Sequence, residues 1–493
     1  MTHFLGIDQS TSATKALLFS ESGELLNKAS LSHSQIYPSP GWVEHDAEEI
    51  YQNTLQAARS LLEKHTGDLV SLSITNQRET FVVFERSTGK PIYNAIVWQC
   101  RRGEPVCRQM VEAGHRGLVE EKTGLLIDTY FPASKIKWLL NERPDIRLQV
   151  EDGRALIGTM DAYLIYRLTG GRQFVTDHTN ASRTLLYDIT HLNWDPELCD
   201  LFGIPVAALP EVRESQACFG ETDLAGLLTN PMPIYGVMGD SQAALFAQRC
   251  FQPGSAKVTF GTGSSILLNI GSEKKAPPQG IVTAVGWVLN GQPTYAYEGI
   301  TNFTGATIQW LRDQLQLIQS ADETEALAES VADNGGVYLV PAFVGLSAPY
   351  WRPEARAGIL GLTPAATKAH IVRAALESIA FIVNDVLQLM GHEAGLELSY
   401  VQADGGAVRN RFLMQFVADI SGLVVRASTT PELSALGAVL SGMLGLGVYR
   451  SLDDIQKIRA GFTEYKPQMP ADQAAVLGSG WQKAVEKVLY SRD

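Results

Sequence analysis

The sequence has no excess of basic residues. Its 493 residues include 40 Lys and Arg against 53 Asp and Glu, which gives a net charge of −13. Proteins that bind nucleic acid use a basic surface to neutralise phosphates. No basic stripe is present here, so a nucleic-acid partner is excluded. Solubility is a sufficient explanation for the acidic balance.

Cysteine is scarce, and the five residues of this type are scattered: Cys100, Cys107, Cys199, Cys218 and Cys250. None forms a C-x-x-C pair, so the spacing carries no zinc signature. A sparse, odd number of cysteines is typical of reduced thiols in the cytosol. We therefore predict a cytoplasmic protein.

Long hydrophobic runs are also missing. The most apolar stretch, "LSALGAVLSGMLGLGV" (433–448), is shorter than the roughly 20 residues that span a bilayer. Its small residues predict a helix packed tightly inside the protein. A strand begins within three residues of the N-terminus, which leaves no room for a signal peptide. We expect no membrane insertion.

No linker or low-complexity run separates the chain into parts, but a repeated sequence pattern indicates two halves. "HFLGIDQSTSATKALLF" (3–19) and "SAKVTFGTGSSILLNIG" (255–271) both show a strand, a turn of small hydroxyl residues and a second strand. Thr11 and Thr262 hold the same position in the two turns. A duplicated hairpin at the start of each half places a boundary near 245–254.

This length exceeds what one hydrophobic core usually organises, and the repeat predicts domains at 1–248 and 249–493. Both halves mix amphipathic helices with short strands, as in an α/β fold. In such folds, ligands bind at the carboxyl ends of strands. The predicted helices are 47–65 and 368–390, and the strands that end in polar or glycine turns are 70–77, 233–240 and 399–407.

The two hairpin turns are candidate phosphate sites. The chain has no G-x-x-x-x-G-K-[ST] motif, so it is not a P-loop protein. Turns of Gly, Ser and Thr present N–H groups and hydroxyls to phosphate oxygens, and two facing hairpins would hold β- and γ-phosphates. Asp8, in "DQSTSATK" (8–15), would hold Mg²⁺ through water. An ordinary β-hairpin is the alternative for either turn alone.

Asp240 stands at a strand end and a helix start in "YGVMGDSQAALFAQ" (235–248). One interpretation is an N-cap that accepts backbone N–H groups. The other is a catalytic base that takes the proton of a substrate hydroxyl as it attacks a γ-phosphoryl group. The segment favours neither.

The stretch "TNQRET" (75–80) places Arg78 beside Glu79 at a strand end. A guanidinium and a carboxylate that converge would bind a neutral polyhydroxylated molecule through donors and acceptors. Trp98 would add a flat apolar wall for its carbon edge. The alternatives are a surface ion pair and a core tryptophan.

A glycine pair follows another strand in "QADGGAVRNRFLMQ" (402–415). Glycine lets the backbone approach a planar ligand such as adenine, and Asn410 could hydrogen-bond to it. A simple loop is the alternative.

These motifs together resemble the FGGY family of carbohydrate kinases, most closely its glycerol-phosphorylating branch. The resemblance implies two ribonuclease-H-like (actin-type ATPase) α/β domains that flank a nucleotide and substrate cleft. It implies phosphorylation of a primary hydroxyl of glycerol by ATP with Mg²⁺. It covers about residues 4 to 450, through "IYPSPGWVEHD" (36–46), "TNQRET", "TGKPIYNAIVWQCRR" (88–102), "TDHTNASRTLLYD" (176–188), "FGTGSS" (260–265), "GATIQWLRD" (305–313), "AFVGLSAPYW" (342–351) and "DGGAVRNRFLMQF" (404–416).

The resemblance also assigns residues. Asp240 matches the catalytic base, and Asp8 matches the metal position. The residues that match ATP-binding positions are Thr11, Ser12, Lys15, Gly261, Thr262, Gln309, Gly406 and Asn410. The residues that match the polyol site are Arg78, Glu79, Trp98, Tyr130, Asp240, Ser241 and Ser265.

The sequence departs from the family pattern at four positions. Ser10 replaces a glycine, and Lys15 replaces an arginine and so loses the bidentate fork. Ser241 stands for a glutamine and Ser265 for a phenylalanine, which shortens the pocket wall. The space would admit a larger polyol or a ketose, such as erythritol, ribitol or xylulose. The Arg78–Glu79 pair still favours glycerol as the substrate over these larger molecules.

Further expectations come from the fold and the family. A sugar-sensing ATPase without transfer chemistry could share this fold, although a sensor needs no base. Members of the family commonly form dimers or tetramers, so we expect a homodimer or homotetramer. After about residue 450, "SLDDIQKI" and "GWQKAVEKVLY" are predicted surface helices.

Overall fold

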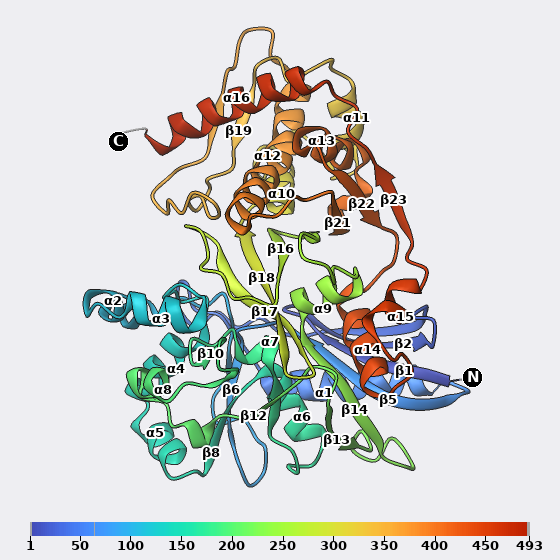
Figure 1. Ribbon diagram of the computed structural model, residues 1–493. Helices are drawn as coiled ribbons and strands as arrows, with labels where there is room; N and C mark the ends of the chain where they lie inside the picture. The colour runs from blue at the N-terminus through green and yellow to red at the C-terminus, as the bar shows by residue number, and fades with distance from the viewer. Residues whose placement is uncertain (1, 64, 491–493) are drawn as a thin grey trace.

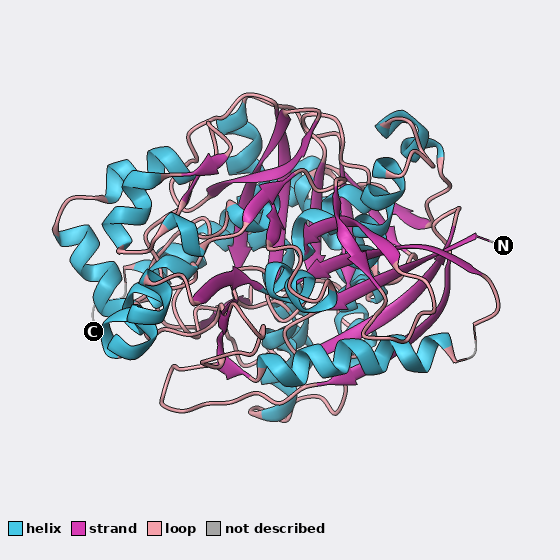
Figure 2. Ribbon diagram, turned by 90° about the horizontal axis from the view of Figure 1, so that it is seen from below, coloured by secondary structure: helices cyan, strands magenta, loops and turns pink. Residues whose placement is uncertain are grey.

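The computed structural model describes residues 2–63 and 65–490, which form two lobes, one above the other in Figure 1. Each lobe is built on one large mixed sheet, so the predicted two-domain α/β class is confirmed. Seen from below, helices lie around the strands of both lobes (Figure 2).

The lower lobe contains a six-stranded sheet in the order β13-β14-β5-β1-β2-β3. Strands β1, β5 and β14 are parallel, and the others join at the edges as antiparallel hairpins. The bounds are β1 (Thr2–Gln9), β2 (Ala13–Ser20), β3 (Leu25–Ser32), β5 (Asp68–Asn76), β13 (Cys218–Thr222) and β14 (Met232–Gly239).

The upper lobe contains a seven-stranded sheet in the order β17-β18-β16-β15-β21-β22-β23. The bounds are β15 (Ala256–Phe260), β16 (Ser264–Gly271), β17 (Val282–Leu289), β18 (Gln292–Thr301), β21 (Tyr400–Gly405), β22 (Val424–Ser428) and β23 (Phe462–Tyr465). The short strands of the remaining sheets are β4 (Glu44–His45), β6 (Phe81–Glu85), β7 (Ala95–Ile96), β8 (Ala155–Thr159), β9 (Val175–Asp177), β10 (Tyr187–Asp188), β11 (Asn193–Trp194), β12 (Glu211–Arg213), β19 (Tyr338–Val340) and β20 (Gly358–Leu360).

The duplicated hairpin is present in both sheets. Strand β1 pairs with β2 antiparallel and with β5 parallel, and β15 pairs with β16 antiparallel and with β21 parallel. Thr11 and Thr262 are each the middle residue of the three that connect the paired strands. The repeat predicted from the sequence is therefore confirmed as a structural repeat.

The helices cover the faces of both sheets (Figure 1). The predicted helix 47–65 is α1, which ends three residues earlier than predicted. The predicted helix 368–390 is α12, which ends four residues later than predicted. The bounds are α1 (Ala47–Leu62), α2 (Glu104–Glu112), α3 (Arg116–Thr123), α4 (Pro132–Glu142), α5 (Pro144–Glu151), α6 (Met160–Leu168), α7 (His178–Ala181), α8 (Pro196–Phe202), α9 (Asp240–Ala247), α10 (Gly305–Asp313), α11 (Glu323–Glu329), α12 (Lys368–Ala394), α13 (Arg411–Ser421), α14 (Leu433–Gly445), α15 (Leu452–Lys457) and α16 (Ala471–Leu489).

Helix α14 is a tightly packed internal helix, as its small residues predict. A methyl group on Gly437 would lie 1.8 Å from the carbonyl oxygen of Ala243 in α9, and one on Gly442 would lie 2.6 Å from that of Tyr235 in β14. Close backbone approach therefore requires glycine at both positions. Although α14 belongs to the second half of the sequence, it packs against the lower sheet. The exact domain boundary stays a prediction.

The predicted surface helix near the C-terminus is present as α16, which packs on the upper lobe through one buried face. Trp481 is 1% exposed and stacks on Phe381 of α12, with ring centroids 5.2 Å apart. Its indole Nε1 donates a 2.7 Å hydrogen bond to Asp385. The apolar side of the helix finds a partner that lies about a hundred residues away in the chain, which the local sequence does not specify.

Among the described residues, one helix, α12, is long and apolar enough to cross a membrane. Of its most apolar window, 78% is buried inside the protein. This burial is typical of a core helix.

Candidate active site

The turn of the first hairpin is held in place from three sides. The Trp98 indole donates a 3.0 Å hydrogen bond to Thr11 Oγ1. His33 Nε2 and Gln35 Nε2 each donate to the Thr11 carbonyl oxygen at 2.9 Å. The predicted phosphate turn is thereby fixed to the predicted polyol wall, while Ser12 is exposed.

Asp8 and Lys15 face each other across the β1–β2 ladder, with Lys15 Nζ 3.2 Å from Asp8 Oδ2. Glu432, just before α14, accepts from the same Nζ at 2.7 Å and from Lys28 at 3.2 Å. Burial raises the pKa of Asp8 to about 6, against the opposing effect of Lys15. The sequence did not indicate Glu432, which neutralises the lysine predicted to bind phosphate.

The surroundings of Asp8 are compatible with Mg²⁺. Within residues 2–63 and 65–490, no group of three or more His, Cys, Asp or Glu side chains is placed to hold a metal ion. Mg²⁺ usually takes one or two carboxylates and completes its shell with water and phosphates. The negative charges of Glu432 and Asp240 also raise the pKa of Asp8, so they lie near its carboxylate. One buried acid with others close by fits that coordination habit.

Arg78 is the centre of a buried charge cluster beyond the end of β5. Its Nη2 donates to Glu298 Oε1 at 2.7 Å, and its Nη1 donates to Gln242 Oε1 at 3.1 Å. Its Nε lies 3.2 Å from Asp240 Oδ1 and 3.9 Å from Glu79 Oε1. The predicted convergence of Arg78 with Glu79 is thus present, and the surface-pair alternative is wrong because Arg78 is 5% exposed.

Two members of this cluster escaped sequence reasoning. Arg183 Nε donates to Glu79 Oε1 at 2.6 Å, and its Nη1 lies 2.6 Å from Glu298 Oε2. Burial opposes the ionisation of Glu298, but Arg183 and Arg78 outweigh it and hold its pKa at about 2. Burial raises the pKa of Glu79 despite the same arginines. Glu298 belongs to the upper sheet, so the cluster joins the two lobes.

Asp240 is the first residue of α9, and Gly239 is the N-cap. The N-cap interpretation of Asp240 is therefore wrong; its Oδ1 accepts only the neighbouring N–H of Ser241, at 2.6 Å, among the residues described. Oδ2 has no hydrogen-bond partner in that part of the chain. The Asp240 side chain is 40% exposed, whereas those of Glu79 and Glu298 are 2% and 0% exposed. Asp240 is thus the open carboxylate of the cluster.

Aromatic and hydroxyl side chains flank this cluster. The rings of Trp98 and Tyr130 lie 5.3 Å apart at 55°. Ser265 Oγ lies 3.3 Å from Ser241 Oγ and 3.4 Å from Glu298 Oε1. The two serines that depart from the family pattern therefore lie side by side beside the buried charges.

Lys135 supports the aromatic wall from inside the protein, and the sequence analysis missed it. Its Nζ donates to the carbonyl oxygens of Trp98 and Tyr130 at 3.3 and 3.1 Å. Burial lowers its pKa to about 8. A lysine in the amphipathic pattern of α4 gives no signal that it points inward.

Five predicted nucleotide residues line one cavity of about 670 Å³ in the upper lobe: Gly261, Thr262, Gln309, Gly406 and Asn410. The second hairpin turn is tied to the start of α10, because Ala306 N donates to Thr262 O at 3.0 Å and Gly305 N donates to Gly261 O at 3.0 Å. The turn and Gln309 are thereby positioned together.

The two glycines at the end of β21, Gly405 and Gly406, have different surroundings. Gly405 has φ of 94°, and a methyl group there would lie 2.2 Å from the Phe260 carbonyl oxygen, whereas Gly406 faces open space. Asn410 is the N-cap of α13: its Oδ1 accepts from Leu413 N at 2.8 Å, and its Nδ2 donates to Thr324 Oγ1 at 3.0 Å. Both ends of its amide are therefore engaged within the protein, and a direct bond to adenine stays a prediction.

Comparison with known families covers most of the chain. Residues 3–247 match the N-terminal domain of the FGGY family of carbohydrate kinases, and residues 256–446 match its C-terminal domain. Similar proteins include glycerol kinase 1 of Thermotoga maritima, 47% identical over 99% of both chains. A glycerol kinase of Desulfitobacterium hafniense is 45% identical, also over 99% of both chains.

Solved structures agree in fold. The crystal structure of Plasmodium falciparum glycerol kinase with ADP has a TM-score of 0.95 and 36% identity, and the match covers 100% of this chain and 99% of that chain. A ligand-bound xylulose kinase from Lactobacillus acidophilus has a TM-score of 0.90 at 21% identity, over 100% of this chain and 99% of that one. The two lobes and their relative placement are thus shared with sugar kinases of the actin-like ATPase fold.

Proposed function

Because this chain belongs to the FGGY family of carbohydrate kinases, we propose that it transfers the γ-phosphoryl group of ATP to a primary hydroxyl of glycerol. The products are sn-glycerol 3-phosphate and ADP. Relatives named glycerol kinases at 44–47% identity over nearly the whole chain support this substrate. The ADP named in the Plasmodium falciparum structure supports the nucleotide.

The open carboxylate of Asp240 is the observation that carries the proposal. Oδ1 is engaged by Ser241 N and lies near Arg78, which leaves Oδ2 to receive a proton. The substrate oxygen loses its proton to Oδ2 as it forms a bond to the γ-phosphorus, and the bond between that phosphorus and the β,γ-bridging oxygen breaks. ADP leaves with that electron pair. Proton transfer by a positioned base contributes about 10²–10⁴ in rate.

The buried charges and the aromatic wall bind the polyol in this scheme. Arg78 donates to substrate oxygens, and Glu79 accepts from substrate hydroxyls. Trp98 and Tyr130 cover the carbon edge. Because the charged groups are already held by ion pairs, they need no reorganisation when substrate binds.

The two hairpins bind ATP from both lobes. Thr11 and Ser12 face the phosphates from the lower lobe, and Gly261 and Thr262 face them from the upper lobe. Lys15 contributes charge once a phosphate competes with Glu432 for its amine. Gln309, Gly406 and Asn410 line the nucleotide cavity. Asp8 would hold Mg²⁺, which when bound neutralises charge on the β- and γ-phosphates.

The Asp240→Asn variant tests the base. Its amide oxygen can still accept from Ser241, but its other atom cannot take a proton, so kcat should fall about 10²–10⁴-fold. ADP release measures turnover, and calorimetry with ADP measures nucleotide binding. We expect unchanged ADP affinity. Turnover close to that of the unmodified enzyme would contradict the assignment.

Ser241 and Ser265 favour a second candidate, a kinase for a larger polyol or ketose. Their hydroxyls meet at 3.3 Å where bulkier side chains are usual, and small side chains leave room for extra carbons. A panel of glycerol, dihydroxyacetone, erythritol, ribitol and xylulose decides between the two. We expect the highest kcat/KM for glycerol. A four- or five-carbon substrate with a much higher kcat/KM would replace it.

We also propose that the enzyme acts in the cytoplasm as a homodimer or homotetramer. The scarce, unpaired cysteines support the compartment. Analytical ultracentrifugation of the purified chain tests the assembly, and a monomer at micromolar concentration would contradict it.

A further inference from the structure

The chain passes between the two lobes three times within residues 2–63 and 65–490. The first passage runs from α9 to β15. The second runs from β22 to α14 and the third from α15 to β23 (Figure 1). All three border one cavity of about 450 Å³, which we call the hinge pocket. Its lining consists of Ser22–Leu25, Ala247–Arg249, Gln402, Ser428–Pro431, Leu433, Leu436, Leu440 and Ile458–Phe462.

Arg249 is a buried cation in this pocket. It is 9% exposed, and its Nε donates to the Ile455 carbonyl oxygen at 3.0 Å. Its two terminal nitrogens have no hydrogen-bond partner among the described residues, and no carboxylate there forms an ion pair with it. Burial lowers its pKa. A buried charge without a counter-ion is costly, so the guanidinium is better satisfied when an anion enters.

The backbone of Arg249 is also held in an unfavourable conformation. Its φ is 57°, in the left-handed position that ends α9, where its N–H donates to Phe246 O at 2.9 Å and Cys250 N donates to Leu245 O at 3.2 Å. Glycine is the usual residue at this position of a helix end. An arginine in this conformation is sterically strained, and no ion pair of its guanidinium within the described chain offsets that strain.

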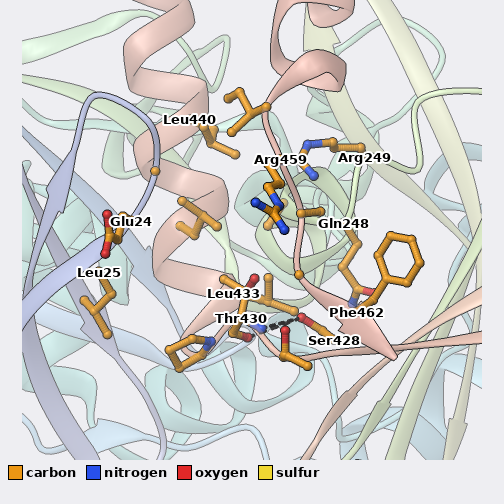
Figure 3. Close-up of a pocket in the computed structure, with 18 of the residues that line it drawn as sticks. Glu24, Leu25, Gln248, Arg249, Ser428, Thr430, Leu433, Leu440, Arg459 and Phe462 are labelled. Carbon is orange, nitrogen blue, oxygen red and sulfur yellow. Dashed lines mark hydrogen bonds between the residues drawn. The ribbon is translucent and has the colours of Figure 1, made fainter. Parts of the chain in front are cut away.

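Other groups of the pocket suit a phosphate. Arg459, an exposed residue of the third passage, brings a second guanidinium. Figure 3 shows it beside Arg249, with Glu24 at the left of the view. The hydroxyls of Thr429 and Thr430 have no hydrogen-bond partner in the described chain and stand on the second passage. Two guanidinium groups repel each other unless an anion lies between them. Glu24 is exposed and offsets part of this charge.

We propose that the hinge pocket binds the phosphate group of a small organic or inorganic phosphate, separately from the nucleotide and polyol sites. The volume lies in the range of small-molecule sites, and arginine forks match phosphate geometry. Because the bound group contacts all three passages between the lobes, it favours one relative position of the lobes over others. The pocket is therefore an effector site for the kinase.

Calorimetry with inorganic phosphate, and separately with phenyl phosphate, tests the binding site. Saturating ADP and glycerol are present so that the nucleotide and polyol sites are filled. The key variant is Arg249→Gly, which removes the guanidinium and places the preferred residue at the helix end, so the fold is retained. We expect binding to the unmodified protein, at least tenfold weaker binding to Arg249→Gly and intermediate binding to Arg249→Lys. Binding of phenyl phosphate alone would assign an organic ligand.

The matched control is Asn290→Gly, which relieves another left-handed residue (φ 53°) outside the pocket and should leave phosphate binding unchanged. Equal affinity in Arg249→Gly, or no binding to the unmodified protein, overturns the site. Because calorimetry needs no turnover, this result is independent of the proposed reaction. In the kinase assay, phosphate should change the KM for ATP in the unmodified enzyme and not in Arg249→Gly; an identical change in both overturns the effector role.

Discussion

At the scale of single residues, Glu298 is the side chain on which the charge cluster depends. It extends from the upper sheet and lies between two arginines of the lower lobe, 2.7 Å from Arg78 and 2.6 Å from Arg183. All three are almost fully buried. Removing one partner of a buried pair leaves the other charge uncompensated.

We predict that Glu298→Gln lowers the free energy of unfolding by about 3 kcal/mol at pH 7. The pKa of Glu298 is about 2 in the folded protein, below its ordinary value of 4.5. Its stabilisation is therefore fully present above pH 4.5 and is lost as the pH falls toward 2. Urea unfolding at pH 7, 5 and 3 should show the gap between variant and parent shrinking with acid.

The control for this prediction is Glu221→Gln, an exposed carboxylate of β13, which should leave the pH profile unchanged. A gap that stays constant from pH 7 to pH 3 would mean that Glu298 does not titrate as a paired carboxylate.

The residues of this site differ in how well the sequence predicts them. Arg78 and Glu79 were identifiable because they are adjacent at a strand end. Arg183 and Glu298 were not, since the partners of a buried ion pair can lie anywhere in the chain; Glu298 is 220 positions from Arg78. Asp240 was identifiable as a candidate, but only the position of Gly239 as the cap separates its two interpretations.

At the scale of elements, α16 is fixed to the upper lobe by one face. Trp481 stacks on Phe381, and Asp385 accepts hydrogen bonds from Trp481 Nε1 at 2.7 Å and from Gln482 Nε2 at 3.0 Å. The same carboxylate accepts from Tyr350 at 2.6 Å. One half-buried carboxylate thus connects this helix with α12 and with the loop that carries Tyr350.

We predict that Trp481→Ala lowers the free energy of unfolding by about 3–5 kcal/mol, because it leaves a cavity against Phe381 and removes a donor to Asp385. Urea unfolding followed by circular dichroism measures the change. Val476→Ala on the same helix is the control, since Val476 is 70% exposed and should change stability by less than about 0.5 kcal/mol. Equal stability of the two variants would contradict docking of α16.

Local sequence patterns predicted where these helices lie in the chain, but they did not predict which elements the helices pack against. Apolar spacing located α1 and α12 to within a few residues, because periodicity reflects a buried face. The small residues of α14 predicted close packing but not that α9 and β14 provide the contact. Which face meets which partner depends on the path of the whole chain.

At the scale of the whole molecule, the sequence repeat predicted two similar sheets, each opening with a hairpin. That prediction succeeds because a strand, a turn and a second strand are encoded locally. The sequence did not predict how the two lobes contact each other. In particular, it did not predict that α14 returns to the lower lobe or that a cavity lies at the three passages. They depend on contacts between segments hundreds of residues apart.

Helix α14 has a practical consequence for anyone who divides this protein. A fragment that stops at residue 248 would expose the apolar side chains that the helix covers, among them Phe4, Leu17 and Met238, and such patches favour aggregation. The remaining fragment carries the missing layer. Separately expressed, the two pieces should fold only on meeting, so the chain is a natural source for a split-enzyme complementation pair.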